Sequence, residues 1–114
     1  MAGRVALTDV KEGVAMSYLR VAYWKWDVDL TSDEAQEAIQ RIRDEGLRVF
    51  RSQPGFVRYR LIKVDSHTTI GVVEWESQEL GMAGAQQFRE WLKSSGIAQK
   101  ASLETYDGDV LVSS

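Results

Sequence analysis

Residues 53–77 read QPGFVRYRLIKVDSHTTIGVVEWES, and this stretch decides the fold. The only proline, Pro54, precedes a glycine, and this pair ends a helix and introduces a turn. Residues 56–64 are then predicted to form a strand, residues 65–67 a hairpin turn and residues 68–75 the antiparallel partner strand. The second strand ends on a tryptophan that is followed by a possible helix-capping serine. The chain is therefore predicted to pass from sheet to helix at this point.

The segment before the hairpin is predicted to contain a strand and a helix. Residues 15–28 are rich in aromatic residues and are predicted to form the first strand. Alternation places Trp24 and Trp26 on one face of this strand. Their side chains are expected either to pack in the core or to lie at an interface or pocket. Residues 31–34, Thr-Ser-Asp-Glu, are typical of a capping box, in which the threonine hydroxyl accepts the amide three residues later. A helix is predicted to begin there.

The segment after the hairpin supplies a second helix and a fourth strand. Ser77 is expected to cap the helix, Gly96 to end it, and residues 102–112 to form the last strand. The order βαββαβ predicts an α+β, ferredoxin-like fold, in which a four-stranded antiparallel sheet carries two helices on one face. Because both faces of the predicted strands carry apolar residues, the uncovered face is expected to pack against a second copy in a homodimer.

Composition limits the class of protein. A chain of 114 residues, 44% of them hydrophobic, fits one compact domain, expected over residues 15–114, after an N-terminal arm over residues 1–14. A net charge of −3 with scattered basic residues argues against nucleic-acid binding. No apolar run predicts a membrane span or a signal peptide, so a cytoplasmic location is expected. The absence of cysteine and the single histidine argue against a protein metal site.

Three short motifs, spread over about residues 16–112, resemble one family. They are residues 53–56 with Tyr59, residues 73–77 and residues 88–95. Their order and spacing resemble the antibiotic-biosynthesis-monooxygenase family of dimeric α+β barrels. The resemblance implies the ferredoxin-like fold and a homodimer. The family includes cofactor-free oxygenases of polycyclic aromatic compounds, haem-degrading enzymes and quinol oxygenases, so that the fold alone does not fix the function.

Two branches of the family imply different site residues. In the oxygenases of aromatic compounds, a tryptophan that matches Trp75 lines the pocket. An asparagine four residues before it and a tyrosine six residues after it are replaced here by Gly71 and Gly81. Gly71 shares the strand face of that tryptophan, so it leaves space for a ligand but supplies no hydrogen bond. In the haem-degrading branch, Trp91 matches a tryptophan that contacts the porphyrin, but the iron-binding histidine ten residues later is Ala101, which argues against axial ligation there.

These considerations predict a substrate pocket whose lining residues are Trp75, Trp91, Phe88, Gly71 and Tyr59. Each of the aromatic side chains can equally belong to the hydrophobic core, because helices and strands that pack in any core show the same spacing.

Candidate catalytic groups are His67, Tyr59 and Arg58. His67 has an ordinary pKa near neutrality, as a general base requires, but it lies in the predicted hairpin turn, where side chains usually face solvent. The Tyr59 hydroxyl can stabilise an enolate. Arg58 alternates with Arg60, and Arg20 can point the same way, so that a guanidinium can orient an acidic phenol or a carboxylate. The alternative for these arginines is salt bridges to neighbouring glutamates.

The sequence therefore favours a cofactor-independent monooxygenase that acts on an aromatic or quinol-like small molecule without a metal or another cofactor. In such a reaction the substrate supplies the electrons, and the protein supplies a dry aromatic cavity and a hydrogen bond to the anion. The alternative is a non-catalytic module of the same fold that binds a small aromatic ligand or has a regulatory role. A further alternative is a haem-binding protein. Whether the chain is an enzyme stays open at this point.

Overall fold

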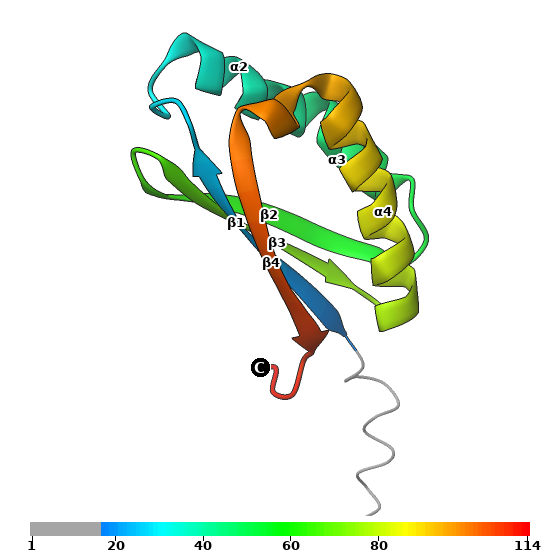
Figure 1. Cartoon of the computed structure of the whole chain (residues 1–114). Coiled ribbons are helices and arrows are strands. Elements are labelled where there is room, and N and C mark those ends of the chain that lie inside the picture. The colour runs from blue at the N-terminus through cyan, green and yellow to red at the C-terminus, as the bar shows by residue number, and fades with distance from the viewer. Residues whose placement is uncertain (1–16) are drawn as a thin grey trace, which may run out of the picture.

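The computed structural model describes residues 17–114, which form one sheet with helices packed on it (Figure 1). The predicted arm, residues 1–14, lies outside the described residues. The elements in chain order are β1 (Tyr18–Trp26), α2 (Asp33–Arg41), the π-helical turn η1 (Ile42–Gly46), α3 (Leu47–Arg51), β2 (Phe56–Asp65), β3 (Thr68–Trp75), α4 (Gln78–Ser95), the 3-10 turn η2 (Ile97–Gln99) and β4 (Ala101–Asp109). The predicted ferredoxin-like α+β fold is confirmed. No helix in the described part is long and apolar enough to cross a membrane.

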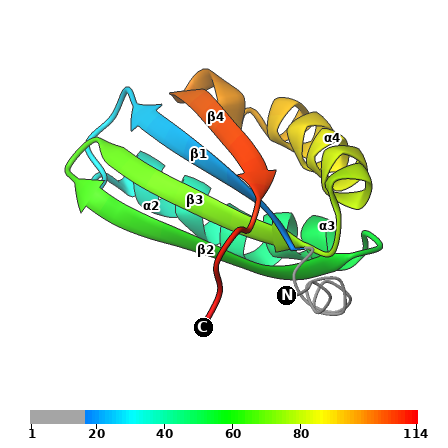
Figure 2. The same ribbon diagram turned by 90° about the horizontal axis from the view of Figure 1, so that it is seen from below.

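The sheet has the strand order β2-β3-β1-β4, and all neighbouring strands are antiparallel. In the register, Gly71 of β3 lies opposite Ala22 of β1 and Leu61 of β2. The helices α2, α3 and α4 lie on one side of the sheet, as Figures 1 and 2 show from two directions. We call this side the helix face and the opposite side the outer face.

The first helix begins one residue later than the sequence predicts. Ser32 is the N-cap, since its hydroxyl accepts from the amide of Ala35 at 3.2 Å. The predicted role of Thr31 is wrong because its hydroxyl instead donates to the carboxylate of Asp29 at 2.6 Å. The second helix begins as predicted, with the Ser77 hydroxyl accepting from the Leu80 amide at 3.2 Å. It ends as predicted at Gly96, which has the left-handed backbone φ of 83° that glycine adopts readily.

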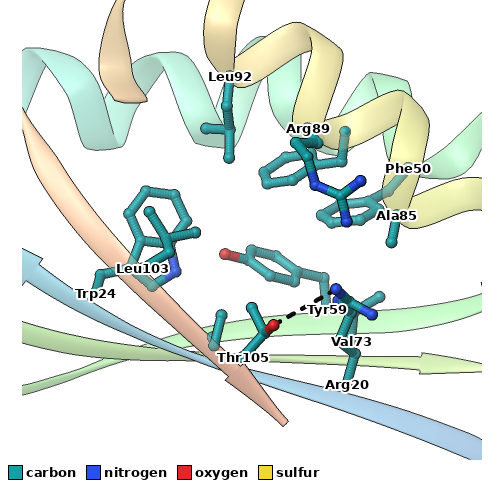
Figure 3. A pocket seen from close by; sticks show the side chains of 13 residues that line it. Arg20, Trp24, Phe50, Tyr59, Val73, Ala85, Arg89, Leu92, Leu103 and Thr105 are labelled. Atoms are coloured by element: carbon teal, nitrogen blue, oxygen red, sulfur yellow. Dashed lines mark hydrogen bonds between the residues drawn. The ribbon is translucent and has the colours of Figure 1, made fainter. Parts of the chain in front are cut away.

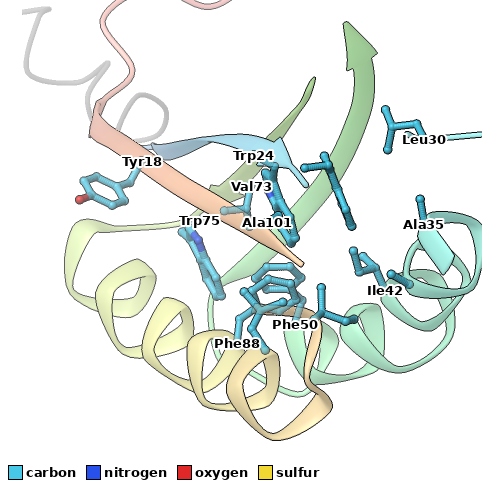
Figure 4. Close-up of a cluster of buried hydrophobic side chains, with 14 residues drawn as sticks. Tyr18, Trp24, Leu30, Ala35, Ile42, Phe50, Val73, Trp75, Phe88 and Ala101 are labelled. Atoms are coloured by element: carbon cyan, nitrogen blue, oxygen red, sulfur yellow. The ribbon is translucent and has the colours of Figure 1, made fainter. Parts of the chain in front are cut away.

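The core lies between the helix face and the helices, and Trp75 lies in it beside α4 (Figure 4). Its indole ring is 0% exposed and packs edge-on against Phe50 and Phe56. Two glycines of α4 let the helix backbone approach this ring. A Cβ atom added at Gly84 would lie 2.5 Å from Cζ3 of Trp75, and one added at Gly81 would lie 3.0 Å from its Cδ1. The indole therefore fills the space between β3 and α4.

Candidate functional site

A cavity of about 80 Å³ lies between the helix face of the sheet and the helices α3 and α4 (Figure 3). Its walls are mainly apolar and include Trp24, Phe50, Phe88 and Leu92. The lining residues that are exposed to solvent, Arg89, Leu103 and Thr105, belong to α4 and β4. The gap between these two elements is therefore the mouth of the cavity. Such a concave, largely apolar space with a few polar groups is typical of small-molecule sites.

Gly71 forms part of the cavity wall and brings two aromatic side chains together. Tyr59 on β2 and Trp24 on β1 are diagonal neighbours of Gly71, at a separation that long aromatic side chains can bridge. A Cβ atom added at Gly71 would lie 2.9 Å from the Tyr59 hydroxyl and 3.4 Å from the Trp24 Nε1. Because glycine has no Cβ, the two polar atoms converge above it in the cavity.

The Tyr59 hydroxyl and the Trp24 Nε1 are buried, and neither has a hydrogen-bond partner among residues 17–114. The adjacent indole of Trp26 differs, since its Nε1 donates to the Thr69 hydroxyl at 3.0 Å. A buried polar group without a partner costs roughly 1–3 kcal/mol. Burial also raises the pKa of Tyr59 well above its ordinary value, so that its hydroxyl stays protonated and can donate. Together, Tyr59 and Trp24 form a donor pair that is suited to a ligand oxygen.

The ionised side chains that line the cavity are both cationic. Arg20 of β1 and Arg89 of α4 lie among its lining residues, and Arg20 pairs with Asp107 at 3.0 Å. Within the described part of the chain, no aspartate, glutamate or histidine lines the cavity. The same residues contain no cluster of histidines, cysteines and carboxylates that could hold a metal ion. The cavity can therefore bind and stabilise an anion, but it offers no carboxylate or imidazole base.

Three of the five predicted pocket residues, Tyr59, Phe88 and Gly71, line the cavity. Trp75 and Trp91 do not. The Trp75 ring is enclosed by the core on the α4 side, as described above. The Trp91 ring packs beside Phe88, and its Nε1 donates to the carboxylate of Glu45 at 3.3 Å.

Two of the predicted catalytic groups lie away from the cavity. His67 is exposed in the hairpin turn, where its Nδ1 lies 3.0 Å from the Ser66 hydroxyl. Arg58 lies opposite Glu74 and forms a salt bridge with it at 3.5 Å, as the alternative interpretation of the arginines expected. The role of either residue in catalysis is not supported by its position.

The prediction that Arg20 and Arg58 share a face is wrong, and a β-bulge explains why. The register of β2 shifts between Phe56 and Arg58, so that one extra residue is inserted in this strand. Strict alternation from Phe56 would put Arg58 on the helix face. The bulge instead turns Arg58 to the outer face and brings Tyr59 to the helix face, opposite Val73.

Arg89 is a lining residue that the sequence did not indicate as part of a site. It lies one position after Phe88 on a helix with many polar residues, where an exposed arginine is ordinary. Trp24 was predicted with two open interpretations, and it both packs in the core and lines the cavity. Its position on the same strand face as Trp26, with which it stacks at 5.5 Å between ring centroids, follows from alternation.

Comparison with known proteins supports the fold. No family model matches the chain, and no curated protein matches it. Similar solved structures include SnoaB, a cofactor-independent oxygenase from Streptomyces nogalater, which is 13% identical with a TM-score of 0.69 over 87% of this chain and 97% of that chain. A dimeric ferredoxin-like protein from an uncultured marine organism is 10% identical with a TM-score of 0.69 over 86% of this chain and 98% of that chain. A candidate antibiotic biosynthesis monooxygenase from Nitrosomonas europaea is 12% identical. Its TM-score is 0.65 over 86% of this chain and 93% of that chain.

These likenesses confirm, at the level of the fold, the resemblance to the antibiotic-biosynthesis-monooxygenase family. At 10–13% identity they show a shared architecture. The function of this chain has to be argued from its own site.

Proposed function

We propose that this protein is a cofactor-independent monooxygenase that acts on a small, electron-rich phenol or quinol. One observation carries the proposal: the donor pair, Tyr59 and Trp24, converges without partners in an apolar cavity. A ligand oxygen that accepts from both groups removes the cost of leaving them unpaired. Hydrogen bonds to a charged oxygen contribute roughly 1.5–3 kcal/mol, more than those to a neutral oxygen, so the pair favours a phenolate or enolate.

In the proposed reaction the substrate itself reduces dioxygen. A hydroxyl or an activated carbon of the substrate loses a proton, and the resulting anion transfers electrons to oxygen. One oxygen atom enters the product and the other leaves as water, with both electron pairs supplied by the substrate. Fixed donors stabilise the anion as it forms, and the apolar walls keep water from the reactive intermediate.

The absence of a base among the described lining residues restricts the substrate. The donor pair and the two guanidinium groups all favour the ionised form of a bound phenol, and so they lower its pKa. A substrate whose hydroxyl is already acidic can then lose its proton to solvent at the mouth. We therefore expect acidic phenols and quinols to react, and aromatic compounds without a hydroxyl to be inert.

The residues do not fit haem, so no step of the proposed reaction uses it. Where the haem-degrading branch implies an iron-binding histidine, this chain has Ala101, which is buried at the start of β4. The cavity of about 80 Å³ is also well below the roughly 300–1,000 Å³ of pockets that enclose drug-sized ligands. Titration with hemin tests this directly, and we expect no shift of the Soret band.

A non-catalytic binding module is the second candidate function. It is favoured by the lack of an aspartate, glutamate or histidine in the cavity lining of residues 17–114. Such a module would use the donor pair to hold a phenolate without activating it. Binding that occurs without oxygen uptake distinguishes this function from the oxygenase.

We also propose that the protein is a homodimer in which a second copy covers the outer face. That face exposes Tyr23, Ile62 and Tyr106, which are 37%, 53% and 57% exposed. Such a group of exposed apolar side chains is typical of an interaction surface. One similar structure is described as dimeric, which agrees with this arrangement. Light scattering after size exclusion should give twice the 12.9 kDa chain mass, and a Tyr106→Arg variant should shift it toward the monomer.

The proposed activity is tested by oxygen consumption with hydroquinone and naphthohydroquinone, each corrected for its spontaneous oxidation. We expect the protein to raise the rate for at least one of these compounds. Tyr59→Phe should lower kcat/KM by roughly 10- to 100-fold, because it removes one donor to the anion. Tyr23→Phe is the matched control, since Tyr23 lies on the outer face, and it should keep the activity. Rates that never exceed the background, while binding is intact, would refute the oxygenase and leave the binding module.

A further inference from the structure

The shape of the cavity limits what its inner end can hold. The donor pair is buried at this end, while the mouth between α4 and β4 is open to solvent. An apolar cavity of roughly 150 Å³ holds one benzene molecule, and this cavity has about 80 Å³. A ligand with a single aromatic ring therefore fits only if its opposite end extends into the mouth. The groups at the mouth then decide which substituent that end carries.

Two guanidinium groups lie at the mouth and come from opposite walls. Arg20 projects from β1 in the sheet and Arg89 from α4, and the two side chains point toward one another (Figure 3). Arg20 donates to Asp107 at 3.0 Å and is 3.5 Å from the Thr105 hydroxyl. Arg89 donates to the side-chain carbonyl of Gln86 at 2.5 Å and forms no salt bridge with any residue from 17 to 114. Of these two positive charges, only that of Arg20 is paired with a carboxylate in the described part of the chain.

Asp107 is held outside the cavity and does not fill the place between the arginines. Its carboxylate accepts from both the Tyr18 hydroxyl and Arg20. Tyr18 precedes Arg20 by two residues on the same strand face, on the side away from Trp24, and neither Tyr18 nor Asp107 lines the cavity. Asp107 therefore holds the Arg20 side chain through Nη1 without itself lining the cavity.

We propose that Arg20 and Arg89 form an anion subsite at the mouth, so that the ligand is a single-ring hydroxyaryl carboxylate. The ring hydroxyl accepts from the donor pair at the inner end, and the carboxylate binds between the two guanidinium groups. Planar guanidinium groups match a carboxylate in geometry and in charge, and a bound anion relieves the repulsion between two facing cations. The inference rests on the proposed function for the role of the inner end.

The test compares hydroquinone with gentisate, which is the same ring with an added carboxylate. We expect gentisate to bind about tenfold more tightly in titrations followed by tryptophan fluorescence and by calorimetry. Arg89→Gln should bring the two affinities close to each other because it weakens gentisate binding far more than hydroquinone binding, and Arg89→Lys should restore part of the preference. Lys93→Gln is the matched control, because it removes the same charge one turn further along α4, outside the cavity lining, and should keep the preference.

The outcomes separate the anion subsite from the oxygenase. Equal affinities of the natural protein for the two compounds would overturn the anion subsite, even if hydroquinone supports oxygen uptake. A preference for gentisate that Lys93→Gln abolishes as fully as Arg89→Gln would also overturn it, since the effect would come from net charge alone. A preference lost only in Arg89→Gln supports the subsite, even when neither compound consumes oxygen and the oxygenase fails.

Discussion

Replacing Gly71 by alanine tests whether the donor pair is the site, because the change adds one methyl group at the point where the two donors converge. The new Cβ would lie 2.9 Å from the Tyr59 hydroxyl, 3.3 Å from its Cε1 and 3.4 Å from the Trp24 Nε1. Ordinary contact begins near 3.4 Å, so the hydroxyl has to move by about 0.5 Å. The methyl group also takes up part of a cavity of only about 80 Å³.

The effect on binding should exceed the effect on stability. Loss of one hydrogen bond to a charged oxygen costs about 1.5–3 kcal/mol, which weakens binding roughly 10- to 150-fold. For stability, an overpacked methyl group costs about 1–3 kcal/mol, but alanine is more favourable than glycine within a strand by about 0.5–1 kcal/mol. The Gly71→Ala variant should therefore lose between about 0 and 2.5 kcal/mol of unfolding free energy.

The measurements are urea unfolding and titration with gentisate or hydroquinone. Gly108→Ala is the matched control, since Gly108 also lies in a strand and an added Cβ there meets nothing within 4 Å. The control should gain about 0.5–1 kcal/mol of stability and keep its affinity for the ligand. If Gly71→Ala bound the same ligand as tightly as the natural protein, the ligand could not lie above Gly71, and the reasoning would be refuted.

Three further changes test the core, a helix cap and the state of the buried tyrosine. Gly84→Ala should destabilise the fold by at least about 1–3 kcal/mol in urea unfolding, since the new Cβ collides with the Trp75 indole; an unchanged midpoint would mean that α4 does not approach this ring so closely. Ser77→Ala should cost about 0.5–2 kcal/mol, because the Leu80 amide loses its acceptor, and Ser77→Asp should recover most of the loss. The raised pKa of Tyr59 predicts lower stability at alkaline pH: the unfolded chain ionises near its ordinary pKa of about 10, the folded chain does not, and stability falls as pH rises further. Tyr59→Phe should reduce this fall, and an identical pH dependence in both proteins would contradict the burial of the hydroxyl.

The hairpin was predictable because local signals agree there. Alternating β-branched residues, a polar turn and a capping serine all indicate the same boundaries, and the strand over residues 68–75 is observed as predicted. The helix start at Ser32 was missed because Thr31, with Glu34 three residues later, fits the capping box, whereas Ser32 has Ala35 at that position. The choice between them depends on Asp29, which takes up the Thr31 hydroxyl. Which of two neighbouring residues caps a helix is therefore decided by such local contacts.

The candidate site was predicted only in part. The sequence shows which residues share a strand face, but it does not show which of them the helices cover and which of them line the cavity. Alternation places Trp75 and Gly71 correctly on the same face of β3. It does not reveal that Gly81 and Gly84 let α4 close over the Trp75 ring, so that the cavity lies further along the sheet. The bulge in β2, which brings Tyr59 into the cavity, also leaves no sequence signal, because it breaks the alternation from which faces are read.

Gly71 therefore has a different structural role from the one that the sequence suggests. The oxygenases that the sequence resembles are expected to carry an asparagine at this position, so the glycine looks like the loss of a hydrogen-bonding group. Here the empty position admits two groups from the neighbouring strands, the Tyr59 hydroxyl and the Trp24 Nε1–H. Both are held on rigid rings with few rotamers, and an indole nitrogen donates but does not accept. An asparagine can present either end of its amide, whereas this pair presents an indole donor and a hydroxyl whose pKa is raised. Under the proposed function, this exchange favours ligand oxygens that carry negative charge, and the substrate has to be acidic enough to lose its proton without a protein base.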